Sequence, residues 1–140
     1  MEMIVGMVKN KWGALPKEST ESFAGRNVLV TGATSGLGYT AAAKFAKLGA
    51  SKIIITARDE AKGAATKSQL EADAGEAVHF EVWDLDMTSY DSVVKFAQRA
   101  VSELDHLDVA VLNIGIFNTA YQPSKHGWEG DLQVLSLIHI

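Results

Sequence analysis

The stretch Thr31-Gly32-Ala33-Thr34-Ser35-Gly36-Leu37-Gly38 has the glycine spacing GxxxGxG and lies between a short apolar run and a segment with helical periodicity. A glycine-rich turn between a strand and a helix lets the backbone approach a pyrophosphate, which the free N–H groups and positive dipole end of the helix attract. No Gly-Lys-Ser/Thr follows, which excludes the loop that holds nucleoside triphosphates. The stretch therefore predicts a dinucleotide site rather than a turn used for packing alone.

Segments typical of strands and of helices alternate from Asn27 onward. Short, nearly continuous apolar runs predict strands at residues 27–31, 52–56, 77–83 and 107–112. Apolar residues at helical spacing predict helices at 37–48, 59–73 and 89–104, and a further helix is expected at 128–134. Such alternation favours parallel strand pairing with helices on both faces. The predicted fold class is α/β, a Rossmann-type doubly wound parallel sheet truncated after about four strands.

Single residues predict where the helices end and which faces they bury. Asp59 is suited to cap the second helix, while Gly49 and Gly75 follow the ends of the first and second helices. The faces expected to contact the sheet carry Leu37, Ala41, Ala42, Phe45 and Leu48 in the first helix, and Val93, Val94, Ala97, Ala100, Val101 and Leu104 in the third.

The composition is that of one soluble globular domain, since 47% of the 140 residues are apolar and 21% are charged. A net charge of −4 gives no reason to expect nucleic acid as a partner. The absence of cysteine excludes disulfides and thiolate nucleophiles and is compatible with the reducing cytoplasm, where we expect the protein. The four histidines are not spaced like metal ligands, so no metal site is expected.

Residues 1–25 precede the first predicted strand and are expected to form an N-terminal arm. An acid comes before the short apolar stretch of this arm and lysines come after it, the opposite charge order to that of a signal peptide. Pro16 would end any helix in the arm. We expect the arm to be amphipathic and to pack on the domain, with a partner or a membrane surface as the alternative.

The motifs resemble those of the short-chain dehydrogenase/reductase family. TGATSGLG at 31–38, Asp84-Leu85 and Leu112-Asn113-Ile114-Gly115 follow the family's order and spacing. The resemblance covers about residues 23–134, and the preceding segment with Trp12, Leu15, Pro16 and SFAG is similar to fungal members. It implies an incomplete NAD(P)-binding Rossmann domain at 26–134 and a tail at 135–140 that is foreign to the family.

The residue that meets the adenosine ribose is expected at the end of the second strand, about 20 residues past the glycines. Arg58 occupies this position, and its planar guanidinium suits a 2′-phosphate, which favours NADP. NAD remains possible because Asp59, one position later, could be the acid that binds both ribose hydroxyls, although it also suits a helix cap.

The resemblance assigns further contacts around the cofactor. It implies that Asp84 bonds the adenine amino group, with Leu85 beside the ring, although Asp84 could also cap the turn before Ser89. Asn113 and Gly115 are expected along the cofactor, and Ile114, where the family usually has alanine, would crowd the nicotinamide side. The complete predicted set is Gly32, Thr34, Ser35, Gly36, Leu37, Gly38, Arg58, Asp84, Leu85, Asn113 and Gly115.

Tyr121-Gln122-Pro123-Ser124-Lys125 matches the Tyr-x-x-x-Lys pair with which the family moves a proton. The catalytic pair must lie one helical turn apart, and Pro123 between its members is disfavoured inside a helix. Lys125 also lies only 12 positions after Asn113, whereas the family places its tyrosine beyond a further helix and strand. We interpret this match as coincidence and expect no catalytic residue in the chain.

The family's proton-relay asparagine would follow Val134, where Leu135–Ile140 stands instead, so we expect an inactive N-terminal fragment. The predicted function of the parent is NADP-dependent hydride transfer between the nicotinamide and a small carbonyl or alcohol substrate, and the parent could be a homo-oligomer. The alternative is a non-catalytic NAD(P)-binding or redox-sensing module. A methyltransferase on the same fold is disfavoured by the basic Arg58.

Overall fold

A computed structural model describes residues 17–74 and 78–136 of the chain. Its strands are β1 (Asn27–Val30), β2 (Lys52–Ala57), β3 (His79–Asp84) and β4 (Val109–Val111). Its helices are α2 (Gly36–Lys47), α3 (Glu60–Ala74), α4 (Tyr90–Glu103) and the short α5 (Gly130–Ser136). Strand and helix alternate from β1 to α5, as the apolar periodicity predicts.

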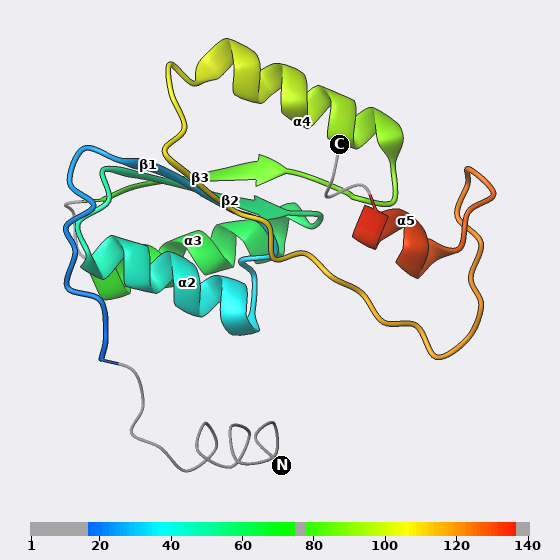
Figure 1. Cartoon of the computed structure of the whole chain (residues 1–140), viewed down its shortest axis with the longest axis horizontal. Helices are drawn as coiled ribbons and strands as arrows, with labels where there is room; N and C mark the ends of the chain where they lie inside the picture. The colour runs from blue at the N-terminus through cyan, green and yellow to red at the C-terminus, as the bar shows by residue number, and fades with distance from the viewer. Residues whose placement is uncertain (1–16, 75–77, 137–140) are drawn as a thin grey trace, which may run out of the picture.

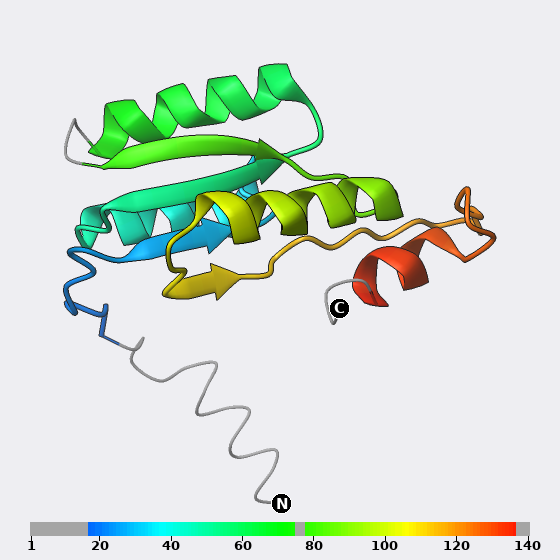
Figure 2. The same ribbon diagram turned by 90° about the horizontal axis from the view of Figure 1, so that it is seen from above.

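The strands form one parallel sheet in the order β3-β2-β1-β4. Helices α2 and α3 cover one face and α4 covers the other, while α5 lies beyond the carboxyl ends of the strands (Figure 1). The same layers are seen from above in Figure 2. Strands β2 and β3 are added on one side of β1 and β4 on the other, so the order of strand addition reverses between β1 and β4. This reversal creates a switch point at the carboxyl ends of these two strands. The predicted α/β, Rossmann-type class is confirmed.

The core beneath α2 and α3 is built from the inward-facing residues of three strands. Val28 and Val30 of β1, Ile53 and Ile55 of β2, and Phe80 of β3 are fully buried there. Alternate strand residues point to opposite faces, which is why these five lie on one side. Phe23 packs on this cluster from before β1, with its ring 5.0 Å from that of Phe45.

The opposite face is covered by α4 and centres on Trp83, which is fully buried. The ring of Trp83 meets Phe96 edge-on at 5.6 Å, and its Nε1 donates to Glu81 at 2.8 Å. Lys52 lies 2.8 Å from the other carboxylate oxygen of Glu81. Burial acts to raise the pKa of Glu81, but hydrogen bonds from Lys52 and Trp83 outweigh it and lower that pKa to about 2.

Several predicted helix ends are confirmed. Asp59 accepts a hydrogen bond from the backbone N–H of Lys62 at 2.8 Å and so caps α3. Ser89 accepts one from Ser92 at the start of α4, and Gly49 follows α2 with φ of 86°. Gly75, the beginning of the strand predicted at 77, residues 1–16 of the arm and residues 137–140 of the tail lie outside the described residues.

Two predicted buried faces need correction. Leu37 is 81% exposed, and α2 instead buries the small residues Gly38, Ala42 and Ala46, because a helix this close to the sheet has no room for larger side chains. In α4, Val94, Ala97 and Val101 are exposed, and the packing residues are Val93, Phe96, Ala100 and Leu104. The face of α4 that packs on the sheet is centred on Phe96, whose large ring reaches Trp83, and it leaves Val94 and Val101 outside.

No helix of the described residues is long and apolar enough to cross a membrane.

Candidate functional site

A cleft of about 430 Å³ opens at the carboxyl ends of β1, β2 and β4, at the switch point of the strand order. Segments from across the chain line it: the turn at 32–37, the end of β2 at 56–58, the turn at 85–88, the segment 113–116 after β4, and Val134 of α5. Of the eleven predicted contacts, nine line this cleft: Gly32, Thr34, Ser35, Gly36, Leu37, Arg58, Leu85, Asn113 and Gly115. Gly38 and Asp84 do not.

The glycine turn needs its glycines for two different reasons. Gly32 and Gly36 have φ of 66° and 55°, a left-handed backbone conformation that side chains disfavour. Gly38 is buried in α2, and a Cβ there would lie 2.2 Å from the carbonyl oxygen of Gly32 and 2.8 Å from Nδ2 of Asn113. Gly38 is thus the residue that lets α2 begin directly against the turn, although it does not line the cleft itself.

The first turn of α2 faces the cleft with unused hydrogen-bond donors. Ser35 is its N-cap, in an extended conformation with no hydrogen bond from a backbone N–H to its side chain. The first turn contains no acidic residue that would compete for an anion. The N–H groups and the positive dipole end therefore remain available for negative charge.

Thr31 and Asn113 join the two strands that flank the switch point. The buried Thr31 accepts hydrogen bonds through Oγ1 from the backbone N–H of Asn113 at 3.0 Å and of Ile114 at 3.4 Å. Nδ2 of Asn113 donates to the carbonyl of Gly32 at 3.3 Å. These bonds fix the glycine turn relative to the segment after β4, so both walls of the cleft are held together.

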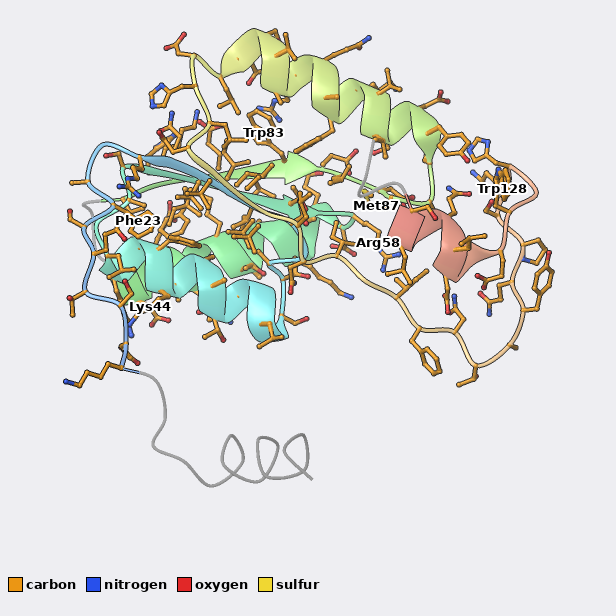
Figure 3. The ribbon with its side chains drawn as sticks, viewed as in Figure 1. Phe23, Lys44, Arg58, Trp83, Met87 and Trp128 are labelled. Atoms are coloured by element: carbon orange, nitrogen blue, oxygen red, sulfur yellow. The ribbon has the colours of Figure 1, made fainter. Side chains whose placement is uncertain are left out.

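Arg58 extends from the end of β2 at the rim of the cleft, where Figure 3 labels it. Its side chain is exposed, and none of the ion pairs found within residues 17–74 and 78–136 includes it. Next to it, the buried hydroxyl of Thr56 accepts from the N–H of Gly32 at 3.4 Å. The end of β2 thus supplies an uncommitted guanidinium and a contact that positions the glycine turn.

The turn after β3 differs from the prediction. Asp84 is exposed at the end of β3 and lines a second cleft, beside the first one. The predicted alternative, that Asp84 caps the turn before Ser89, is wrong, because Asp86 fills that role. Its Oδ1 accepts from the N–H of Thr88 at 2.9 Å and from the Thr88 hydroxyl at 2.7 Å. Asp86 and Thr88 line the first cleft, although neither residue is part of a motif in the sequence.

An apolar wall closes the cleft on the side of α5. Leu85, Met87 and Val134 are buried there, with Ile114 and Ile116 packed against them. A Cβ on Gly32 would lie 3.2 Å from Cγ1 of Ile114, so this isoleucine occupies the space beside the glycine turn. Ile114 therefore lines the cleft beside the glycine turn, and the crowding of the nicotinamide side that the resemblance implies stays a prediction.

Tyr121 and Lys125 lie in the loop between β4 and α5, outside any helix, and neither lines a cleft described here. Tyr121 is 72% exposed. The loop is closed at its base by Asp131, which accepts hydrogen bonds from the backbone N–H of Asn118 at 2.9 Å and from its side chain at 2.6 Å. Inside it, Pro123 pairs with Glu129 in an antiparallel bridge, so the proline shapes a hairpin-like turn rather than a helix.

Together, the parallel sheet, the switch point and the glycine turn at the start of α2 define a Rossmann-type domain with a cleft at the carboxyl ends of its strands. A family model described as "short chain dehydrogenase" matches residues 26–135. The chain belongs to this family.

Two fungal relatives are similar over most of the chain. A short-chain dehydrogenase/reductase of Aspergillus flavipes is 44% identical over 122 residues, which are 85% of this chain and 35% of the relative. One from Phaeosphaeria nodorum is 43% identical over 124 residues, or 84% of this chain and 35% of that protein. The chain thus spans about a third of the length of these relatives.

Solved structures share the fold. A short-chain dehydrogenase from Sphingobium yanoikuyae, solved in complex with NADPH, superposes with a TM-score of 0.67 at 25% identity, covering 81% of this chain and 44% of that one. The L-sorbose reductase of Gluconobacter frateurii superposes with a TM-score of 0.70 at 22% identity, covering 86% of this chain and 45% of that one.

Proposed function

We propose that the cleft binds NADP as the cofactor half of an oxidoreductase. The pyrophosphate would lie over the glycine turn and the N-terminus of α2, and the phosphorylated ribose beside Arg58. The nicotinamide would then extend toward Asn113 and Ile114. The residues present fit this group, because Gly32 and Gly36 leave the backbone open to a phosphate and α2 offers free N–H groups.

The observation that carries the choice of NADP is the uncommitted guanidinium of Arg58 at the rim of the cleft. A 2′-phosphate adds two negative charges and several acceptor oxygens, which a planar guanidinium binds through paired hydrogen bonds. Asp59, the possible NAD-type acid, uses its carboxylate to cap α3. The NADPH bound in the related Sphingobium yanoikuyae enzyme agrees with this assignment.

The reaction we propose for the whole protein is hydride transfer between the nicotinamide and a small carbonyl or alcohol. The bound nicotinamide supplies or accepts the hydride. Residues of this chain bind and orient the cofactor, while Met87, Ile114 and Val134 make an apolar wall that keeps water from one side of the cleft. Tyr121 and Lys125 take no part in proton transfer, because they lie on an exposed loop outside any helix and neither lines the cleft.

The binding preference for NADPH tests the role of Arg58. We expect the chain to bind NADPH more tightly than NADH by roughly tenfold or more, and Arg58→Gln to remove most of that difference by weakening NADPH alone. Isothermal titration calorimetry at fixed ionic strength measures both affinities. Lys47→Gln, which removes an exposed lysine at the far end of α2, is the control and should leave the ratio unchanged. Equal affinities for both cofactors in the unaltered chain would refute the proposal for NADP.

The role of Tyr121 is tested separately by turnover. We expect no oxidation of NADPH by the purified 140-residue chain with a panel of aldehydes and ketones, followed at the nicotinamide absorbance band. Turnover that Tyr121→Phe abolishes and Tyr39→Phe leaves unchanged would show that the loop tyrosine is catalytic after all. Tyr39 is a suitable control because its hydroxyl is engaged by Asp73, between α2 and α3.

A further inference from the structure

A second cleft of about 670 Å³ adjoins the first and shares Ala57 and Arg58 with it. It is lined by α3 through Glu60, Ala64 and Lys67, by β3 through Val82 and Asp84, and by α4 through Arg99. β3 is the outermost strand, and α3 and α4 cover opposite faces of the sheet (Figure 1). The lining residues from both helices therefore place this cleft at the outer edge of β3. Arg58 stands where the two clefts meet.

Basic side chains from three different elements converge on this second cleft. Arg58, Lys67 and Arg99 contribute three positive charges, against two negative charges from Glu60 and Asp84. The lining itself therefore has an excess of one positive charge, but Glu71 and Glu103 lie against Lys67 and Arg99 just outside it. What the cleft offers an anionic group is therefore the hydrogen-bond donors that these cations leave unused, rather than a net positive charge.

Arg99 is held in place by its neighbours. Its guanidinium carbon lies 4.3 Å from the centre of the Trp83 ring, and its Nε donates to Glu103 at 3.0 Å. This arrangement leaves its terminal nitrogens without a hydrogen bond among the described residues. Lys67 is 3.6 Å from Glu71 on its own helix, an ion pair too long for a strong hydrogen bond. Both cations can therefore still contact an added anion.

We propose that Lys67 and Arg99 act with Arg58 as specificity-determining residues for the 2′-phosphate of NADP, the second cleft being the subsite that receives it. This inference rests on the proposed function, since it presupposes that the adenosine end of the cofactor lies at Arg58. It adds two residues that the glycine motif and the end of β2 do not indicate. Arg58 is the first contact, and Lys67 and Arg99 lie on either side of the sheet edge behind it.

The test uses probes that contain only the adenosine end of the cofactor: adenosine 2′,5′-bisphosphate and 5′-AMP. Calorimetric affinities of both are measured on the 140-residue chain and on Arg58→Gln, Lys67→Gln and Arg99→Gln. Lys62→Gln on α3 and Lys95→Gln on α4 remove exposed lysines from the same helices that do not line the cleft, and are the matched controls. Because Arg99 packs on Trp83, Arg99→Lys is included to keep the charge while changing the packing.

Lys67→Gln and Arg99→Gln are each expected to lower the affinity for adenosine 2′,5′-bisphosphate by roughly threefold to tenfold and to leave the affinity for 5′-AMP unchanged. The two control variants should change neither affinity. Arg99→Lys should retain most of the preference. If Arg58→Gln removes the preference while Lys67→Gln and Arg99→Gln match their controls, the inference is overturned and the proposed function stands. If the unaltered chain binds both probes equally, the proposal for NADP itself fails.

Discussion

Gly38→Ala is expected to abolish dinucleotide binding and to lower the free energy of unfolding by about 2–3 kcal/mol. The added methyl group would lie 2.2 Å from the carbonyl oxygen of Gly32, and backbone cannot rotate away as a flexible side chain can. It would also meet Nδ2 of Asn113, 2.8 Å away, which bonds the same carbonyl. Helix α2 must therefore move away from the turn, and the N–H groups that face the cleft move with it.

Urea denaturation followed by circular dichroism measures the stability, and NADPH calorimetry measures the binding. Gly115→Ala is the control for stability, because a Cβ there meets only Leu135 at 3.9 Å and φ is not positive. Its unfolding midpoint should match that of the unaltered chain. A Gly38→Ala variant with unchanged midpoint and affinity would show that the turn and α2 are not packed as tightly as the structure indicates.

Trp83→Ala is expected to lower the free energy of unfolding by about 3–5 kcal/mol, which is a large fraction of the stability of a small domain. Trp83, labelled in Figure 3, is fully buried between the sheet and α4. It contacts Phe96, Arg99 and Glu81. Its removal would leave a cavity beneath α4 and take from the Glu81 carboxylate one of its donors. Helix α4 should lose its position on the sheet.

Thermal and urea unfolding of Trp83→Ala are compared with Trp128→Ala, which truncates an exposed tryptophan in the loop before α5 and should cost less than about 0.5 kcal/mol. Trp83→Phe keeps most of the apolar volume but not the Nε1 donor. Its loss of unfolding free energy should therefore lie between the losses of Trp83→Ala and Trp128→Ala. Equal losses for the Trp83 and Trp128 variants would contradict the central place given to Trp83.

The order and class of the elements could be predicted because the strands are buried on both faces and so have nearly uninterrupted apolar sequences. Ile53, Ile54 and Ile55 are all fully buried, three in succession, as only a covered parallel strand allows. The faces of α2 and α4 were harder to predict. Apolar periodicity marks Leu37 and Val101 as buried, yet Leu37 lies at the rim of the cleft and Val101, at 85% exposure, faces away from the sheet.

The glycine turn, Arg58 and Asn113 could be identified from the sequence because each directly follows a strand, and the ends of parallel strands meet at one edge. Thr56 could have been noticed by the same reasoning, but its hydroxyl bond to Gly32 depends on strand register. Lys67 and Arg99 could not be identified, since they lie in the interiors of two helices whose separation depends on how each covers the edge of β3. The turn cap was assigned to Asp84 rather than to Asp86, because both acids precede Ser89 and only the structure shows that Asp84 ends β3 while Asp86 bonds Thr88.

The Asn118–Asp131 clamp closes the intervening loop at its base, and the loop also touches the rest of the domain through His126, whose ring lies 4.0 Å from that of Tyr90. Its two hydrogen bonds join residues 13 positions apart, and within it Gly130 bonds Gln122 and Ser124 bonds Trp128. A segment that satisfies its own backbone in this way can change sequence or length between its fixed ends without altering the sheet or the glycine turn. Tyr121 and Trp128, both exposed within the loop, could therefore be exchanged at little cost to folding, so that this part of the surface can diversify while the glycine turn and the first cleft stay constant.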